Sequence, residues 1–310
     1  MSRRVRMAVV GLGQWGRHHA RILAHLPDVE LAGVVDTNPR EAAHLAHRYG
    51  TRSHTDYRNL LGQVEAVTIA VPTVLHYAIA RDFLDAGAHV LVEKPMTATA
   101  EEAAALSELA AERGRVLLVG HIERFKPAVQ RLFRLVSDPL AIEARRMRPY
   151  DSGRSMDTGV VMDLMIHDID IVDSMLPGRF GDPQAIGVCV HNSHEDLAMA
   201  RMRTSSGCLV TFTASRVAVR KTAEMEVTMA DRAIHLDLLR QSIAISFFNG
   251  ETQRITLEGE EPLELELRHF VECVRSGSRP LVGGEDGRRA LEITETVLAR
   301  MVRITPPVRV

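Results

Sequence analysis

The stretch Arg4–Gly16, RVRMAVVGLGQWG, joins a short apolar run to a glycine-rich turn and then to a helical pattern. Its last six residues have the form G-x-G-x-x-G. In this setting Gly11 permits the tight turn, Gly13 lets the backbone approach a pyrophosphate, and Gly16 lets helix and strand pack closely. Free N–H groups at the start of the helix favour a bound anion. The stretch therefore predicts a dinucleotide-binding βαβ unit, with an ordinary glycine turn as the alternative.

Short apolar runs alternate with amphipathic patterns over the first part of the chain. Runs such as AVTIAV are apolar at every position, which is typical of parallel strands covered by helices on both faces. This alternation predicts a doubly wound parallel sheet, the Rossmann arrangement. The expected strands are Arg4–Val10, Glu30–Val35, Ala66–Val71, His89–Glu93 and Arg115–Val119, and the expected helices are Gln14–Leu26, Arg40–Tyr49, Val74–Ala86 and Ala100–Arg113.

The pattern becomes β-rich after Gly120, with turn-forming pairs such as Asn249-Gly250 between the runs. This predicts a second α/β domain with a mostly antiparallel open sheet. Its expected strands are Ala185–His191, Ala198–Arg203, Cys208–Ser215, Glu224–Met229, Ala233–Leu238, Ser242–Phe248 and Thr252–Leu257. Its expected helices are Lys126–Val136, Val160–Leu176 (ended by Pro177-Gly178), Pro262–Ser276 and Glu285–Val302. The fold class is α/β, with a Rossmann domain at residues 1–120 and a substrate-binding and oligomerisation domain at residues 121–310.

The 310 residues, 45% of them hydrophobic and 25% charged, suffice for two globular domains. The formal net charge of -2 shows no excess of positive charge that would attract nucleic acid or an anionic membrane, so neither is expected as a partner. Cys189, Cys208 and Cys273 are scattered, so we expect neither disulfides nor a metal site. No signal-peptide pattern and no apolar run of the ~18 residues that span a bilayer is present, and we expect a cytoplasmic protein.

Asp36 ends the second predicted strand, about 20 residues beyond the last glycine of the motif. A carboxylate at this point accepts hydrogen bonds from the ribose hydroxyls of the adenosine and repels the 2′-phosphate of NADP. It therefore favours NAD as the cofactor. Arg40 nearby leaves NADP open, and a helix cap is the alternative role of Asp36.

Other candidate cofactor contacts follow the strands at the carboxyl edge of the sheet, where ligands bind in open α/β folds. His76 starts a helix there, and a surface histidine is its alternative reading. Lys94 follows the strand HVLVE at residues 89–93, and an exposed loop lysine is its alternative reading. The full set of expected cofactor contacts is Gly11, Leu12, Gly13, Gln14, Trp15, Gly16, Asp36, Val71, Pro72, His76, Glu93 and Lys94.

Asp163 and His167 are spaced i,i+4 on the predicted helix Val160–Leu176, and Asp170 and Ser174 continue the same stripe. The positions around them are mostly apolar. A polar seam on a buried helix is costly unless it lines a cavity or is internally paired. We therefore expect a carboxylate–imidazole pair for proton transfer, with a structural histidine as the alternative.

Five segments together resemble the Gfo/Idh/MocA family of NAD(P)-dependent oxidoreductases. They are VVGLGQWG (9–16), VVDTN (34–38), AVPTVLHYAIA (70–80), VEKPMT (92–97) and DLMIHDID (163–170), in the family's order and approximate spacing. The resemblance implies a Rossmann domain followed by a substrate domain, and it implies that Lys94, Asp163 and His167 are catalytic. It also implies a sugar, inositol or nucleotide sugar as substrate, oxidised or reduced at one carbon.

GHIERFKPAV (120–129) and DTGVVMDLMIHDID (157–170) resemble the members that oxidise UDP-N-acetylglucosamine at its 3-hydroxyl, although Lys126 stands where those relatives usually have Asn. A diphosphate needs cationic partners, for which Arg124, Arg146, Arg148 and Arg154 are candidates or else solvated surface residues. Glu123 and Arg124 alternatively form a salt bridge between the domains. The expected substrate contacts are Glu123, Arg124, Arg148, Tyr150, Arg154, Asp163 and His167.

Two other functions stay open at this point. One is oxidation of a free sugar, polyol or inositol by the same chemistry. The other is a non-catalytic NAD-binding regulator, which would not require Lys94, Asp163 and His167. Because the outer face of an open antiparallel sheet is commonly covered by another subunit, we expect a homo-oligomer, a dimer or tetramer.

Overall fold

The computed structural model describes residues 3–151, 153, 158–176, 180–191 and 193–304. The chain forms two compact units, Met1–Ile122 with Glu260–Arg288 and Glu123–Gly259 with Arg289–Val310. Within the described ranges, every helix is too short or too polar to cross a membrane.

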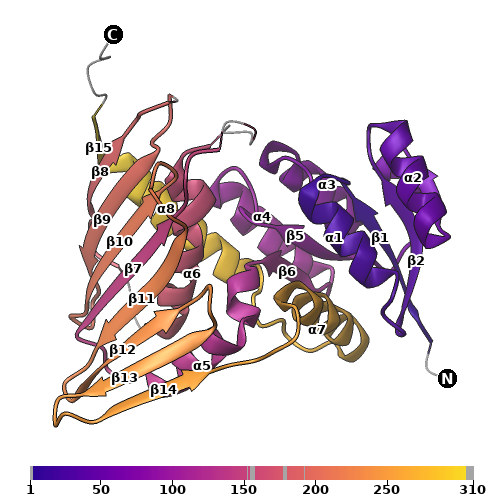
Figure 1. Cartoon of the computed structure of the whole chain (residues 1–310). Coiled ribbons are helices and arrows are strands. Elements are labelled where there is room, and N and C mark those ends of the chain that lie inside the picture. Colours follow the sequence, from indigo (N-terminus) through magenta and orange to yellow (C-terminus); the bar gives the residue numbers. More distant parts are fainter. Residues whose placement is uncertain (1–2, 152, 154–157, 177–179, 192, 305–310) are drawn as a thin grey trace. The chain divides into compact units, whose positions relative to one another are not determined.

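The first unit contains a six-stranded sheet in the order β3-β2-β1-β4-β5-β6 (Figure 1). All five neighbouring pairs are parallel, and the order reverses beside β1, which confirms the predicted doubly wound sheet. β3 is too short and polar for its sequence to have predicted it. The strands are β1 (Val5–Val10), β2 (Val29–Val35), β3 (Arg52–His54), β4 (Ala66–Ile69), β5 (His89–Glu93) and β6 (Leu117–Gly120).

The helices of the first unit fall into two groups by their contacts. Helix α1 contacts α2 and α7, whereas α3 contacts α4. Right-handed crossovers on either side of β1 place these two groups on opposite faces of the sheet. The bounds are α1 (Gln14–Leu23), α2 (Pro39–Tyr49), α3 (His76–Asp85), α4 (Ala100–Glu112) and α7 (Pro262–Ser276), with short 3-10 helices at Tyr57–Leu60 and Thr73–Leu75.

Helix α7 lies in the first unit, although it follows all but one of the second unit's strands in sequence. Its apolar side, which includes Leu267 and Phe270, is fully buried. Helix α8 (Gly284–Ala299) begins in the first unit and continues in the second. The predicted division after residue 120 placed α7 in the second domain. The compact units differ from that division because α7 packs on α1 and β1 of the first unit.

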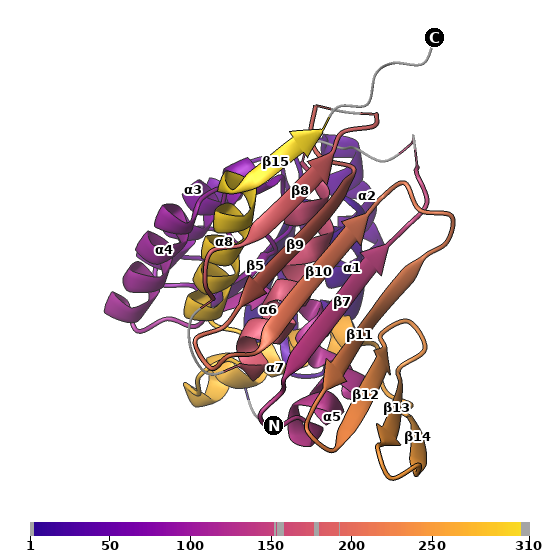
Figure 2. The ribbon, with the colours of Figure 1, turned by 90° about the vertical axis from the view of Figure 1, so that its left-hand side faces the viewer.

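The second unit is built on a nine-stranded sheet in the order β14-β13-β12-β11-β7-β10-β9-β8-β15, seen face-on in Figure 2. Two pairs, β10 with β7 and β15 with β8, are parallel, and the other neighbours are antiparallel, as the sequence predicted. The strands are β7 (Ala141–Met147), β8 (Gln184–Val188), β9 (Leu197–Arg203), β10 (Leu209–Ser215), β11 (Thr222–Thr228), β12 (Arg232–Asp237), β13 (Ser242–Phe247), β14 (Thr252–Thr256) and β15 (Met301–Ile304).

Two strands of this sheet had no counterpart among the expected elements. β7 lies between β10 and β11, and its middle residues alternate: Ile142 and Ala144 are buried, whereas Glu143 and Arg145 are exposed. β15 begins two residues after α8 ends, so the predicted closing helix to Val302 is wrong in its last residues. Because β15 pairs with β8, the end of the chain completes one edge of the sheet.

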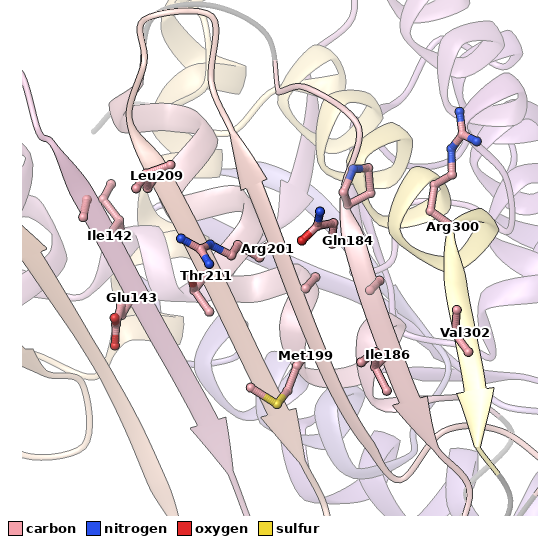
Figure 3. A pocket seen from close by; sticks show the side chains of 14 residues that line it. Ile142, Glu143, Gln184, Ile186, Met199, Arg201, Leu209, Thr211, Arg300 and Val302 are labelled. Atoms are coloured by element: carbon pink, nitrogen blue, oxygen red, sulfur yellow. The ribbon is translucent and has the colours of Figure 1, made fainter.

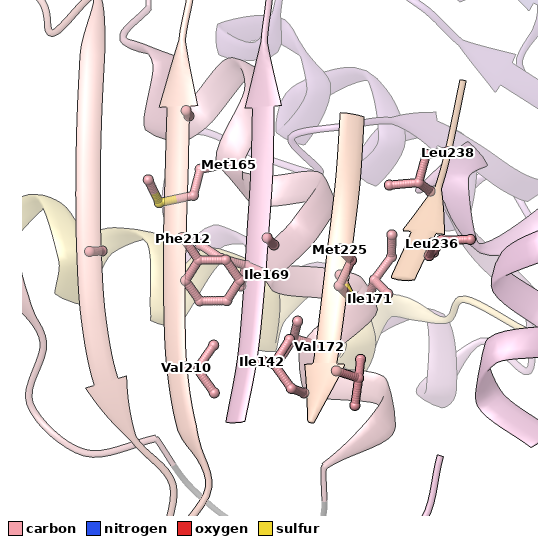
Figure 4. Packing of buried hydrophobic residues seen from close by; sticks show 14 of the residues in the cluster. Ile142, Met165, Ile169, Ile171, Val172, Val210, Phe212, Met225, Leu236 and Leu238 are labelled. Atoms are coloured by element: carbon pink, nitrogen blue, oxygen red, sulfur yellow. The ribbon is translucent and has the colours of Figure 1, made fainter. Parts of the chain in front are cut away.

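The core of the second unit lies between one face of the sheet and the helical segment that crosses it (Figure 4). Phe212 of β10, Ile142 of β7 and Met225 of β11 face Met165 and Ile169 of that segment. Burying each such side chain contributes about 1.5–3 kcal/mol relative to exposure. Helices α5 (Pro127–Leu135) and α6 (Ile166–Met175) lie on this same face (Figure 2). The core thereby fixes the helix that carries Asp163 and His167.

Candidate active site

The glycine-rich loop has the geometry that a dinucleotide requires. Gly11 has a φ of 87°, and a Cβ there would collide with the carbonyl oxygen of Ala70. A Cβ on Gly16 would collide with the carbonyl oxygen of Gly11. At Gly13, by contrast, a Cβ would meet nothing within 4 Å, so the backbone borders open space. Among the described side chains none caps the start of α1, so its N–H groups remain available to a pyrophosphate.

Asp36 links the glycine-rich loop to the turn after β2. Its Oδ2 accepts the N–H of Leu12 at 2.8 Å, and its Oδ1 accepts the N–H of Asn38 at 2.8 Å. The cap of α2 is Asn38, whose side chain accepts the N–H of Arg40 at 3.1 Å. The carboxylate is therefore held at the carboxyl end of β2, next to the loop that would receive the cofactor.

His76 is buried and lies between two backbone carbonyls at the carboxyl edge of the sheet. Its Nδ1 is 2.8 Å from the carbonyl oxygen of Pro95, and its Nε2 is 2.8 Å from that of Val71. Burial lowers the pKa of His76 despite these acceptors, so the ring is neutral and only one contact at a time is a hydrogen bond. The imidazole thus connects the loop after β4 to the loop after β5. Pro72, another expected cofactor contact in the loop after β4, is exposed.

A buried group of acids lies next to Lys94. Oε1 of Glu93 is 3.0 Å from Nε2 of His19, and Oε2 of Glu93 accepts the N–H of Lys94 at 3.3 Å. Glu266 of α7 is fully buried, and neither of its carboxyl oxygens has a hydrogen-bond partner among the described residues. Burial, and then the charge of Glu93, raise the pKa of Glu266 well above its ordinary value. The sequence patterns pointed to neither His19 nor Glu266.

Lys94 belongs to the first unit, whereas Asp163 and His167 belong to the second. All three side chains are half-buried. The segment with Asp163 and His167 begins as a π-helical turn, Val161–Met165, before α6. The regular helix predicted from Val160 is therefore wrong in its first turn, and its expected end at Pro177-Gly178 lies outside the described residues. Asp170 is buried and Ser174 is exposed, so they do not continue the predicted stripe.

Three cations and three acids of the second unit form buried or half-buried ion pairs. Arg146 contacts Asp168 through Nη2 at 2.7 Å and through Nε at 3.1 Å, and its Nη2 is 3.1 Å from Oε2 of Glu123. Nζ of Lys126 is 2.9 Å from Oε1 of Glu123. Burial alone would raise the pKa of Glu123, but Arg146 and Lys126 outweigh it and hold that pKa below its ordinary range. A further pair joins Arg148 to Asp163, with Nη2 of Arg148 3.4 Å from Oδ2 of Asp163.

The remaining expected substrate contacts have different surroundings. Arg124 is buried, with Nη1 3.3 Å from Oδ1 of Asp170. Tyr150 is 42% exposed, and its ring lies over that of His191 with centroids 3.9 Å apart. Arg154 lies outside the described residues. Arg124, Arg146 and Arg148, three of the four arginines considered for a diphosphate, are thus engaged by carboxylates of the same unit.

A second buried group, absent from the sequence-based candidates, holds the start of the segment that carries Asp163 and His167. The backbone oxygen of Glu195 accepts the N–H of Val160 at 3.0 Å, and its Oε1 accepts that of Val161 at 3.2 Å. Arg216 donates to the carbonyl oxygen of Thr158 at 2.8 Å. The pair Glu195-Asp196 resembles an ordinary charged turn in sequence, so no local pattern marks this role.

The outer face of the nine-stranded sheet carries a groove of about 820 Å³ (Figure 3). Ile186, Met199, Leu209 and Val302 line it and are 42–64% exposed. Glu143 and Arg201 line the same groove. This face is opposite to the one that packs against α6.

Comparison with known sequences identifies the class of protein. Residues 5–121 match the model of an oxidoreductase family with an NAD-binding Rossmann fold, and residues 137–235 match the GFO/IDH/MocA C-terminal domain. The chain belongs to this Gfo/Idh/MocA family, and it is an NAD(P)-dependent oxidoreductase. The resemblance seen in the sequence motifs is confirmed, and so is the NAD-type cofactor.

Particular relatives cover nearly the whole chain. A UDP-N-acetylglucosamine 3-dehydrogenase of Acidithiobacillus ferrooxidans is 34% identical over 297 residues, which are 93% of this chain and 94% of the relative. A scyllo-inositol 2-dehydrogenase (NAD(+)) of Bacillus subtilis is 29% identical, covering 94% and 93%. The solved structure of the Acidithiobacillus enzyme matches with a TM-score of 0.91 at 34% identity over 97% of this chain and 98% of that one. Levoglucosan dehydrogenase in complex with NADH and levoglucosan, at 18% identity and a TM-score of 0.88, shares the fold.

Proposed function

We propose that the protein is an NAD-dependent dehydrogenase that oxidises the 3-hydroxyl of UDP-N-acetylglucosamine. The observation that carries the proposal is the 34% identity to a UDP-N-acetylglucosamine 3-dehydrogenase over almost the full length of both chains. The segments 120–129 and 157–170, which resemble such members, support it. We assign the cofactor to the first unit and the substrate to the second.

The glycine-rich loop and Asp36 would hold the cofactor. Gly13 leaves the space for the pyrophosphate, and the N–H groups of α1 complement its charge. Asp36 would accept the ribose hydroxyls while keeping its bond to the N–H of Leu12. NAD, when bound, accepts the hydride from the substrate carbon.

Three side chains of the protein would handle the proton of the reacting hydroxyl. His167 accepts it, because an imidazole with an ordinary pKa near ~6.5 exchanges protons at neutral pH. Asp163, four residues earlier, orients the imidazole and stabilises its charged form. Lys94 donates a hydrogen bond to the reacting oxygen and stabilises the negative charge that develops on it.

The second candidate is a dehydrogenase of a free sugar, polyol or inositol. The observation that favours it is the 29% identity to a scyllo-inositol 2-dehydrogenase, again over almost the whole chain. The internal ion pairs of Arg124, Arg146 and Arg148 also leave fewer cations for a diphosphate. Of the four arginines considered, Arg154, which lies outside the described residues, then stays as a candidate for that contact.

A direct assay separates the two candidates. The protein is incubated with NAD and UDP-N-acetylglucosamine, with a carbonyl trap to draw off a ketone product. Mass spectrometry should find a trapped product derived from a ketone two mass units lighter than the substrate, together with NADH absorbance. No product from the sugar nucleotide, alongside oxidation of scyllo-inositol or a free sugar, would overturn the proposal in favour of the second candidate.

The groove on the outer face of the sheet is proposed to bind a second copy of the chain. A two-fold interface is self-complementary, so if a residue of one copy contacts a given residue of the other, the reverse contact forms as well. Glu143 and Arg201 offer opposite charges along the groove, and Ile186 and Met199 offer the apolar surface (Figure 3). A dimer formed here would pair Arg201 of each copy with Glu143 of the other.

A further inference from the structure

Two arginines at the end of β7 meet two aspartates of the helical segment 161–175. Arg146 is the penultimate residue of β7, and Arg148 follows the last residue of the strand, Met147. Arg146 contacts Asp168 at 2.7 Å, and Arg148 contacts Asp163 at 3.4 Å. The two aspartates are five residues apart in sequence.

The π-helical turn explains how residues five apart can face one strand. In an α-helix with 3.6 residues per turn, such residues point about 140° away from each other. A π turn bonds residue i to residue i+5 and therefore aligns them. One helical turn rises about 5.4 Å, and two residues of extended chain rise about 6.6 Å. The spacing between Arg146 and Arg148 therefore matches the spacing between Asp163 and Asp168, which are about one turn apart along the helical segment.

Arg148 is held firmly enough to act on its partner. Its N–H donates to the carbonyl oxygen of Ser215 at 2.8 Å, and its own carbonyl accepts the N–H of Ala218 at 3.1 Å. Its side chain is 12% exposed, and that of Asp163 is 17% exposed. Charges interact more strongly in such partly desolvated surroundings than in water.

The other charges at this end of β7 are already matched. Arg146 is shared between Asp168 and Glu123, and Glu123 also contacts Lys126. Arg148 is therefore the cation that lies against Asp163.

We propose that Arg148 is a positioning residue for the reaction, acting through Asp163. It holds the Asp163 carboxylate ionised and in one orientation, and so sets how readily His167, four residues on, takes up a proton. The inference rests on the proposed function for its catalytic meaning. It differs from the expectation that Arg148 binds the substrate, because a positioning role changes catalysis and proton affinity more than substrate affinity.

The test uses Arg148→Gln and Arg148→Lys, with Arg145→Gln as the matched control. Arg145 is the neighbour of Arg146 on the opposite face of β7, and its partner Glu224 is 3.8 Å away near the surface. In the free protein, the imidazole titration of His167 is followed by NMR. Without Arg148 the Asp163 carboxylate is less firmly ionised and oriented and stabilises the imidazolium less, so Arg148→Gln should lower the pKa of His167. Arg148→Lys and Arg145→Gln should stay close to the parent protein.

Kinetics give the second readout. With Arg148→Gln, kcat should fall, though by less than the ~10²–10⁴-fold lost with a general base, while KM for the sugar nucleotide changes little. The acid limb of the kcat/KM profile should move to lower pH together with the NMR titration. Arg148→Lys should recover most of kcat. Circular dichroism confirms that each variant folds; if Arg148→Gln does not fold, Asp163→Asn probes the same pair from the other side.

A His167 pKa that is unchanged or raised in a folded Arg148→Gln, or a rise in KM with kcat preserved, would overturn the inference. The NMR experiment needs no substrate. A parent protein that fails to oxidise UDP-N-acetylglucosamine would therefore refute the proposed function while a shifted titration still supported the pairing of Arg148 with Asp163.

Discussion

Nε of Arg216 lies 2.7 Å from Oδ1 of Asp196, and the two side chains are 1% and 0% exposed. Oδ2 of the same carboxylate accepts the N–H groups of Val190 and His191 at 2.8 and 2.7 Å. Arg216 also donates to the carbonyl oxygen of Thr158. The pair thus connects the end of β10 to Thr158, just before the segment that carries Asp163 and His167, inside the second unit.

Removing one partner of this pair should destabilise the second unit strongly. Asp196→Ala leaves a buried guanidinium without its counter-charge, which typically costs about 3–5 kcal/mol. Urea denaturation should show that loss in the free energy of unfolding. Glu224→Ala, which removes an exposed partner of Arg145, should cost less than about 1 kcal/mol. Equal effects of the two substitutions would contradict the structural role of Arg216 and Asp196.

Glu266 should make stability fall as pH rises. Its raised pKa means that the folded state keeps the carboxyl protonated while the unfolded chain ionises near pH ~4.3. The stabilisation is complete below that pH and is lost progressively as pH increases toward the folded-state pKa. Urea midpoints measured from pH 5 to pH 8 should therefore decline more in the parent protein than in Glu266→Gln. Parallel declines in the two proteins would show that Glu266 is ionised in the fold.

Asp36 should determine the preference for NAD over NADP. The parent protein should bind NAD more tightly, and Asp36→Ala should narrow the difference because the charge that repels the 2′-phosphate is gone. Trp15, the single tryptophan, lies in the glycine-rich loop and is 41% exposed, so its fluorescence should report binding of both cofactors. Tighter binding of NADP by the parent protein would contradict this role of Asp36.

Lys94→Ala and His167→Ala should each lose turnover while keeping the fold and NAD binding. Loss of a general acid or base typically lowers the rate by ~10²–10⁴-fold. Steady-state kinetics with the true substrate measure the loss, and Trp15 fluorescence measures cofactor affinity. Lys221→Ala, a change at an exposed lysine, is the control and should leave kcat unchanged. Near-normal turnover in either variant would remove that residue from the chemistry.

Met199→Glu should disrupt the proposed oligomer. Met199 is 50% exposed within the groove on the outer sheet face, and a charge there would lose its water on association. Light scattering after size exclusion should show a dimer or tetramer for the parent protein and smaller species for the variant. Val219→Glu, at a residue 99% exposed outside that groove, should behave like the parent. A monomeric parent protein would refute the proposal.

The arrangement of the first sheet could be predicted because its signals are local. Buried parallel strands such as Ala66–Ile69 are continuous apolar runs, and α2 has its cap Asn38 and its terminal Gly50 in sequence. β7 escaped prediction because Glu143, Arg145 and Arg146 obscure its apolar positions. Arg146 can lie on the inner face only because Asp168 and Glu123, distant in sequence, compensate its charge.

The sequence by itself determined the dinucleotide-binding loop, the family and the candidate catalytic side chains. The constraints on Gly11, Gly13 and Gly16 arise from the backbone within and next to the motif, so a short sequence pattern is enough to recognise them. Only the tertiary structure decided which charges pair, where the π turn falls and to which unit α7 belongs. Arg148 meets Asp163, and Arg216 meets Asp196, because a buried charge requires a counter-charge from whichever segment the fold brings near it.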